Sequence, residues 1–121
     1  MRYKYKTKVL SVYDGDTVTI NFDLGFNVNI IEKCRLIGID TPELRTKNKY
    51  EKTLGYKVRD YLRELILDKE VEVETHKEGK WGRYLVDIYI DGIHVNQHLI
   101  DLNYARVYDG GTREKWTLRY V

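Results

Sequence analysis

The first part of the chain alternates between apolar and polar residues. Between residues 17 and 24, every second residue is apolar. An alternation with a period of two places these apolar side chains on one face of a β-strand. Similar runs at about 6–12 and 27–37 predict a strand on either side of it. An Asp-Gly pair at 14–15 and Gly25 separate the runs and favour turns, so we predict a three-stranded meander.

The period changes in the middle of the chain. From about Tyr50 to Leu67, apolar residues recur every three or four positions, which is the spacing of one helix face. Gly55 is a weak point inside this predicted helix, because glycine lowers helix stability. The apolar positions of the predicted face are Leu54, Val58, Tyr61, Leu62, Leu65 and Ile66.

After this helix the alternation returns. Residues 70–75 alternate glutamate with mostly valine, and residues 81–90 predict a further strand. A short helix is predicted over 97–102, with Asn96 as its N-terminal cap. Another short helix is predicted from Thr112 to about Tyr120, with the threonine as its cap.

The order of these elements predicts the fold class. Three strands, a helix, two strands and short C-terminal helices form the plan of an OB-fold. We therefore expect an α+β protein that is mainly β, with a five-stranded antiparallel barrel and a helix between strands 3 and 4. The length of 121 residues predicts a single domain over 1–121. Eleven tyrosines agree with a β-rich chain.

Charge and cysteine content exclude several classes of protein. The net charge is only +2, so the chain carries no polybasic coat, and any nucleic-acid binding must come from a local arrangement of charges. Cys34 is the only cysteine, which excludes an internal disulfide and a cysteine-rich zinc site. No apolar run of about 18 residues predicts a membrane span. We expect a cytoplasmic protein, because no signal peptide is visible, or a secreted one if a leader has been removed.

Three segments at the edges of predicted elements are rich in acids and arginines. They are the residues 14–17, 35–43 and 82–83. Singly, each segment has a structural explanation as a hairpin turn, a helix-opening turn or a solvated corner. Together they hold what phosphodiester cleavage needs: carboxylates for a hard cation, a base for water, and cations for the charge of the transition state. Arginine suits the last task because its planar fork can hold two phosphate oxygens.

These segments resemble the motifs of the thermonuclease, or staphylococcal nuclease-like, family. The motifs are Asp-Gly-Asp-Thr at 14–17, Arg-Leu-Ile-Gly-Ile-Asp-Thr-Pro-Glu at 35–43, and Gly-Arg at 82–83. The resemblance extends from about Lys6 to Tyr108. It implies a calcium-dependent endonuclease on an OB-fold, which cuts DNA and RNA with little sequence preference and leaves 3′-phosphate and 5′-hydroxyl ends.

The resemblance also implies a metal site. Asp16 and Asp40 match the carboxylates that bind Ca²⁺, and the backbone carbonyl of Thr41 joins them. Asp14 matches an acid that supports the site through water. Two direct carboxylates are few for calcium, which takes roughly six to eight oxygen ligands, so we expect weak binding without substrate and poor replacement by magnesium.

For catalysis, the resemblance implies roles for three residues. Glu43 matches the general base, or the group that orients the attacking water, while Arg35 and Arg83 match the pair that holds the scissile phosphate. Arg35 and Asp40 are five residues apart and would face opposite sides of an unbroken strand. We therefore expect the strand to end or bulge at Gly38.

Contacts to the rest of the substrate are less specific in the sequence. Trp81 stands where the family usually has a tyrosine, so it either stacks on the substrate or is a partly buried strand aromatic. Lys80 either contacts a phosphate or is simply solvated, and Tyr108 lies near the family's nucleotide-stacking tyrosine with a shifted spacing. We expect DNA and RNA as partners, with single strands preferred, and no membrane or obligate protein partner.

A second hypothesis belongs to another class of protein. Nuclease-like OB modules without activity bind nucleic acid or protein. Such a module is expected to lose the catalytic acid or one of the arginines, and this chain keeps Glu43, Arg35 and Arg83. The sequence therefore favours the enzyme over the binding module.

Overall fold

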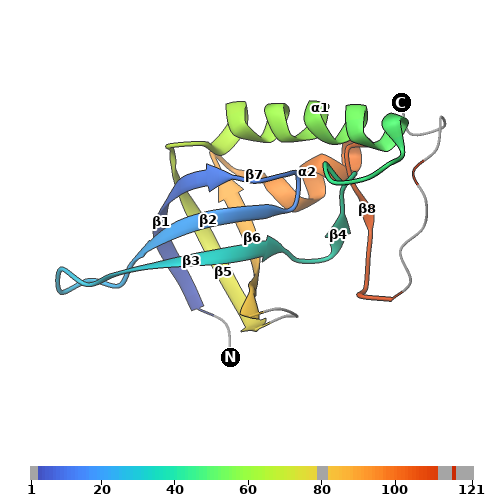
Figure 1. Cartoon of the computed structure of the whole chain (residues 1–121). Helices are drawn as coiled ribbons and strands as arrows, with labels where there is room; N and C mark the ends of the chain where they lie inside the picture. The colour runs from blue at the N-terminus through green and yellow to red at the C-terminus, as the bar shows by residue number, and fades with distance from the viewer. Residues whose placement is uncertain (1–2, 79–81, 112–115, 117–121) are drawn as a thin grey trace.

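The structure, a computed structural model, describes residues 3–78, 82–111 and 116. Five strands close into a barrel in the order β3-β2-β1-β5-β6, and β6 returns to pair with β3 (Figure 1). The predicted mainly β fold with a five-stranded OB-type barrel is confirmed. The barrel strands are β1 (Tyr3–Val12), β2 (Thr17–Asp23), β3 (Asn29–Leu36), β5 (Glu70–Glu78) and β6 (Tyr84–Ile90).

The closure of the barrel differs from the prediction in one respect. Four of the neighbouring pairs are antiparallel, but β3 and β6 run parallel where they meet, with Cys34 opposite Tyr84. A ring of five strands cannot alternate in direction all the way around, because five is odd. The expected wholly antiparallel barrel was therefore wrong, and the parallel pair closes the ring.

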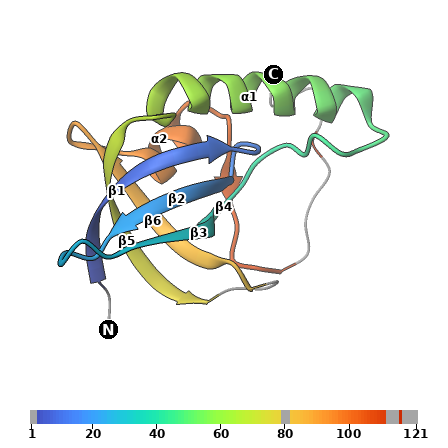
Figure 2. The ribbon, with the colours of Figure 1, turned by 60° about the vertical axis from the view of Figure 1, so that its left-hand side comes forward.

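Two helices and three short strands complete the fold in the part of the chain that the structure describes. Helix α1 (Lys49–Ile66) follows the third barrel strand and lies across one end of the barrel, as both views show (Figures 1 and 2). Neither helix in the described part of the chain is long and apolar enough to cross a membrane. The remaining elements are β4 (Ile39–Asp40), β7 (Ile93–His94), α2 (Val95–Asp101) and β8 (Arg106–Val107).

The core follows the predicted alternation. Val18, Ile20 and Phe22 of β2 point into the barrel and are buried, whereas Leu24 lies beyond the end of the strand and is exposed. The same core buries Cys34 completely, and this burial raises the pKa of its thiol to about 12. This cysteine therefore behaves as a small apolar residue. From α1, the side chains packed inward are Leu54, Val58, Leu62 and Ile66.

The predicted capping role of Asn96 was wrong. Helix α2 begins at Val95, two residues before the predicted start at residue 97, and Asn96 lies inside its first turn. Its buried amide donates to the carbonyls of Ile37 (3.0 Å) and Val86 (3.1 Å) and accepts from the Ile88 amide (3.1 Å). Buried backbone groups need such partners, so tertiary contacts outweigh the local preference of asparagine for caps. The helix predicted from Thr112 to Tyr120 falls almost entirely outside the described residues.

Candidate functional site

A small polar cavity lies where the β1–β2 turn, the end of β3, β4 and the start of β6 meet. Its volume is about 150 Å³. Every predicted site residue that the structure describes lines it, whereas Lys80 and Trp81 lie outside the described residues. The lining consists of Asp14, Asp16, Thr17, Arg35, Asp40, Thr41, Glu43, Arg83 and Tyr108.

Asp16 is held on several sides at the bottom of the cavity. It is only 7% exposed. Its Oδ2 accepts the backbone N–H of Thr41 at 3.1 Å and lies 3.4 Å from Nη2 of Arg35. The hydroxyl of Thr17 donates to Oδ1 at 3.3 Å. Because a buried carboxylate is stable only with such partners, these contacts fix its orientation.

Asp40 is held by an arginine that the sequence motifs do not include. Both Nε and Nη2 of Arg106 donate to its Oδ2, at 3.2 and 3.1 Å. Arg35 lies on the other side, with Nη2 4.0 Å from Oδ1. The only sequence signal for Arg106 is a single charged residue within the run Tyr104–Tyr108. That signal does not indicate a partner, so the motifs did not predict a role for this residue.

Arg35 is anchored at the end of β3. Its Nη1 donates to the carbonyls of Ile39 (3.1 Å) and Leu36 (3.4 Å), and its Cζ lies 5.4 Å from the ring centre of Tyr108. Strand β3 ends at Leu36, and a turn with Gly38 at φ 81° leads into β4. The predicted interruption at Gly38 is therefore confirmed. It allows Arg35 and Asp40 to line one cavity in spite of their odd spacing.

Asp14 and Asp16 reach the cavity from a bend of the backbone. The Asp16 amide donates to Oδ1 of Asp14 at 3.1 Å, which closes a tight Asx-type turn. Burial, together with the charge of Asp16, raises the pKa of Asp14 from 3.8 to about 7. A Cβ added to Gly15 would lie 2.6 Å from Cγ1 of Val58 and 2.8 Å from Cβ of Thr41. The turn can pack against α1 only because residue 15 is glycine.

The segment that carries Glu43 is fastened to α1. The Glu43 amide donates to Oε2 of Glu51 at 2.8 Å, and Glu51 is only 5% exposed. A Cβ added to Gly55 would lie 2.8 Å from the carbonyl oxygen of Glu43 and 3.0 Å from that of Pro42. Gly55 is therefore a close-packing position rather than only a weak point of the helix. Glu51 was missed, although a charged residue three positions before Leu54 on the apolar helix face is a recognisable signal.

Arg83 and Tyr108 complete the wall of the cavity in different ways. Arg83 precedes β6, and its side chain makes no hydrogen bond or ion pair with another residue that the structure describes. Tyr108 is more constrained, because its hydroxyl donates to the carbonyl of Gly111 at 2.8 Å and its amide donates to the carbonyl of Gly38 at 2.9 Å. Arg83 is thus able to turn toward a ligand, whereas Tyr108 supports Arg35.

The cavity offers carboxylate oxygens, which are the kind of ligand that a hard cation prefers. Asp16 and Asp40 are buried carboxylates, and Asp14 is partly buried beside them. Calcium prefers such oxygen ligands and takes roughly six to eight of them. Within the described part of the chain, no three acidic, histidine or cysteine side chains already surround one metal position. The residues therefore fit calcium as an incomplete site, in which other oxygens must supply the remaining ligands.

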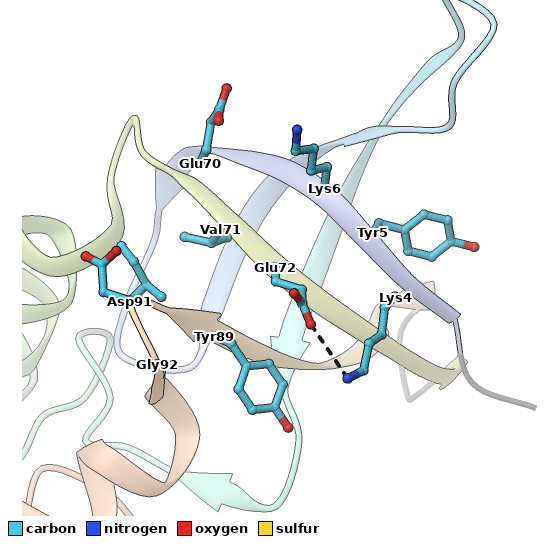
Figure 3. Close-up of a pocket in the computed structure, with 10 residues that line it drawn as sticks. Lys4, Tyr5, Lys6, Glu70, Val71, Glu72, Tyr89, Asp91 and Gly92 are labelled. Carbon is cyan, nitrogen blue, oxygen red and sulfur yellow. Dashed lines mark ion pairs between the residues drawn. The ribbon is translucent and has the colours of Figure 1, made fainter.

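A larger hollow lies elsewhere on the barrel. Its volume is about 580 Å³, and it lies over the outer face of β1, β5 and β6 (Figure 3). Lys4, Lys6, Glu70, Glu72 and Tyr89 are among its lining residues. No residue of this hollow belongs to the three motifs.

Comparison with known proteins agrees with the motifs. Residues 33–119 match a family model described as "Staphylococcal nuclease homologue". The chain is 31% identical to a thermonuclease of Staphylococcus hyicus, in a match that covers 82% of this chain and 57% of that protein. It is 34% identical to an uncharacterized endonuclease of Escherichia coli O157:H7, over 84% of this chain and 60% of that protein.

An archaeal relative extends the similarity. An uncharacterized protein of Methanocaldococcus jannaschii is 34% identical, over 86% of this chain and 59% of its own length. The chain therefore spans less than two thirds of the length of each of these relatives. The matched family region contains most of the cavity residues, from Arg35 to Tyr108, and the barrel supports them as described above. On these grounds the chain is a member of the staphylococcal nuclease homologue family.

Proposed function

We propose that this chain is a calcium-dependent endonuclease that hydrolyses phosphodiester bonds of DNA and RNA. The observation that carries the proposal is the convergence of three aspartates, one glutamate and two arginines on one small cavity. These residues come from segments far apart in the sequence. The names thermonuclease and endonuclease among the relatives support the same kind of reaction.

In the proposed reaction, a water oxygen forms a bond to phosphorus while the bond from phosphorus to the 5′-oxygen breaks. Glu43, which is exposed at the cavity wall, orients this water and accepts its proton. The departing 5′-oxygen takes up a proton from solvent, to which Glu43 later releases the proton it accepted, so the products carry a 3′-phosphate and a 5′-hydroxyl. Hydrolysis in this direction needs no co-reactant other than water.

The two arginines perform different parts of the task. Arg35 is fixed by backbone carbonyls and faces the carboxylates, so it provides a preorganised positive charge for the equatorial phosphate oxygens. Arg83 has no such anchors among the described residues and is able to close on the phosphate once it is bound. Because developing charge is met by groups already in place, little reorganisation is needed during the reaction.

Calcium would be held by Asp16 and Asp40, with the carbonyl of Thr41 and, through water, Asp14 in support. When bound, this ion supplies a Lewis acid that polarises the phosphate. Because burial and the charge of Asp16 raise the pKa of Asp14 to about 7, Asp14 carries its full negative charge only above about pH 7. Calcium binding by the free protein is therefore expected to be weak and to strengthen when a substrate phosphate adds further oxygens.

The nature of the cavity also determines the proposed substrate range. Most of its lining side chains are charged and therefore suit phosphate groups, which occur along every nucleic acid. Direct reading of sequence requires side chains that reach base edges in a groove. We therefore propose little sequence preference, and a preference for single strands, whose backbone bends more easily into a cavity of about 150 Å³.

One experiment separates the enzyme from a binding module. The protein is incubated with denatured DNA in calcium or in a calcium chelator, and the products are separated on a denaturing gel. Shortening that requires calcium supports the proposal. A mobility shift on a native gel without any shortening supports a binding module that lacks activity and contradicts the proposed enzyme.

A further inference from the structure

We propose that Arg106 positions Asp40 for calcium and that Trp116 holds Arg106 in place. This inference rests on the proposed function and extends it to two residues outside the three motifs. It begins with the hydrogen bonds of Asp40. Two N–H groups of one guanidinium, Nε and Nη2, donate to the same carboxylate oxygen, Oδ2, at 3.2 and 3.1 Å.

The backbone strengthens this contact. Asp40 and Arg106 are direct cross-strand partners in the two-stranded sheet of β4 and β8. The two residues are 66 positions apart in the sequence, so only the fold brings them together. Because both the main chain and the side chain are fixed, the carboxylate has little freedom to rotate.

Arg106 acts from behind the cavity. Its side chain is 13% exposed, and it is absent from the cavity lining, whereas Arg35 is part of that lining. The two arginines therefore approach opposite oxygens of Asp40, with Arg106 at Oδ2 and Arg35 nearer to Oδ1. Because Arg106 is not among the residues that line the cavity, we do not expect it to contact a bound phosphate. Its influence on the reaction would then pass through Asp40, which makes Arg106 a positioning residue.

Trp116 fixes the guanidinium from the other side. The Cζ of Arg106 lies 4.4 Å from the centre of the Trp116 ring, a typical cation–π distance. The tryptophan is 1% exposed and packs against Leu54 and Val58 of α1. The order of support therefore runs from α1 to Trp116, from Trp116 to Arg106, and from Arg106 to Asp40.

The size of the expected effect follows from other metal sites. Groups that hydrogen-bond a metal ligand typically change metal affinity by about 10- to 100-fold when they are removed. We expect Arg106→Ala to weaken Ca²⁺ binding by about this factor. Arg106→Lys keeps the charge but loses the planar fork, so it should recover only part of the affinity. Trp116→Phe, which retains an aromatic face, should weaken binding less than Arg106→Ala.

The test measures calcium binding directly rather than cleavage. Ca²⁺ is titrated calorimetrically into the wild type and each variant, with a phosphorothioate single-stranded oligonucleotide present at saturation. Oligonucleotide binding in chelator is measured separately by fluorescence polarisation. We expect the calcium affinity to fall and the oligonucleotide affinity in chelator to stay within about twofold, because Arg106 lies outside the cavity.

Arg59→Ala is the matched control. Arg59 also pairs with an acid, Asp60, at 2.8 Å, and its Cζ also lies over an aromatic ring, that of Tyr56, at 4.6 Å. It belongs to α1 and does not line the cavity. Calcium affinity should therefore be unchanged in this variant, although a similar arginine has been removed.

The outcomes are distinct. A folded Arg106→Ala with wild-type calcium affinity overturns the inference. If that variant does not fold, Arg106→Lys decides the question, and wild-type affinity in that variant would also overturn the inference. If the wild type binds calcium and depends on Arg106 but cuts nothing, the proposed function fails while the inference stands. If the wild type binds no calcium at all, both fail.

Discussion

Two hollows on this barrel, the cavity at the strand ends and the hollow over the outer face, differ in size and in chemistry, and the smaller of the two is lined by motif residues. The larger hollow, about 580 Å³, lies over the outer face of three strands (Figure 3), whereas the cavity at the strand ends is about 150 Å³. Volume alone would indicate the larger hollow as the functional site, although it contains none of the motif residues. The small cavity is distinguished by partly buried charged side chains that come from separate segments of the chain.

The larger hollow neutralises its own charges. Lysines of β1 lie opposite glutamates of β5 in register, with Lys6 opposite Glu72 and Lys8 opposite Glu70. Lys4 and Glu72 approach to 3.6 Å, and their side chains remain 64% and 55% exposed. Such cross-strand pairs stabilise a sheet modestly and leave little charge for a ligand. The comparison shows that alternation along neighbouring strands disperses charge, whereas turns at strand ends concentrate it.

The largest effect is expected from removing charge in the small cavity. Glu43→Ala and Arg83→Ala should each slow cleavage by at least ~100-fold, the scale of losing a general base or a preorganised charge. Initial rates on single-stranded DNA measure this. For Arg83→Ala the midpoint of thermal unfolding should hardly move, because its side chain has no bonded partner among the described residues. Rates within tenfold of wild type in both variants would contradict the proposed mechanism.

The next effect concerns the packing that supports the cavity. Gly55→Ala improves helix propensity by about 1 kcal/mol, yet the new Cβ would lie 2.8 Å from the carbonyl oxygen of Glu43. Because this oxygen belongs to the backbone, the segment must shift, at a cost of about 1–3 kcal/mol. We expect a net loss of stability in urea unfolding and slower cleavage. A more stable variant with wild-type activity would show that the contact is unimportant.

A pH-dependent effect should follow from Asp14. Its pKa is raised from 3.8 to about 7, so the folded state holds this proton more tightly than the unfolded state. The stability that this provides is complete below about pH 4 and is lost as the pH rises through about 7. We therefore expect the free energy of unfolding of the wild type, measured in chelator, to fall relative to that of Asp14→Asn as the pH rises from about 4 to about 7. The expected difference is about 1–2 kcal/mol, allowing for partial solvent screening.

Urea unfolding of both proteins at several pH values in this range measures the difference. Calcium should reduce it, because the cation favours the charged carboxylates over the protonated ones. A constant difference between the two proteins across the range would show that Asp14 titrates normally in the folded state.

The smallest effect is expected in the larger hollow. Glu72→Gln removes one charge from the exposed pair with Lys4, and exposed pairs contribute about 0–1 kcal/mol. Stability should change by less than about 0.5 kcal/mol, and cleavage by less than about twofold. Strong loss of activity in this variant would mean that substrate also occupies the larger hollow, and that the small cavity is not the sole place where charge matters for cleavage.

Much of the fold could be predicted because its signals are local. The alternation at Val18, Ile20 and Phe22 specifies a face of β2, and the helical period specifies the buried face of α1. The break at Gly38 followed from counting residues between Arg35 and Asp40. In each case the physical constraint acts between residues that are near neighbours in the sequence.

The partners of the predicted residues could not be found in this way. Arg106 contacts Asp40 across 66 residues, and Asn96 bonds the carbonyl of Ile37 across 59. Neither pair has a fixed spacing or a local preference that would indicate it. The preference of asparagine for helix caps even indicated a different role.

The sequence by itself determined the strands of the barrel, the long helix and the residues that carry candidate chemistry, because side-chain period and turn geometry are set within a few positions. Only the tertiary structure decided how Asp40 and the Glu43 segment are held, why residues 15 and 55 must lack a side chain, and which pair of strands closes the barrel in parallel. These features depend on which surfaces meet when the chain packs. Each buried polar group then needs a hydrogen-bond partner on the surface packed against it, and each close contact needs a side chain small enough to fit.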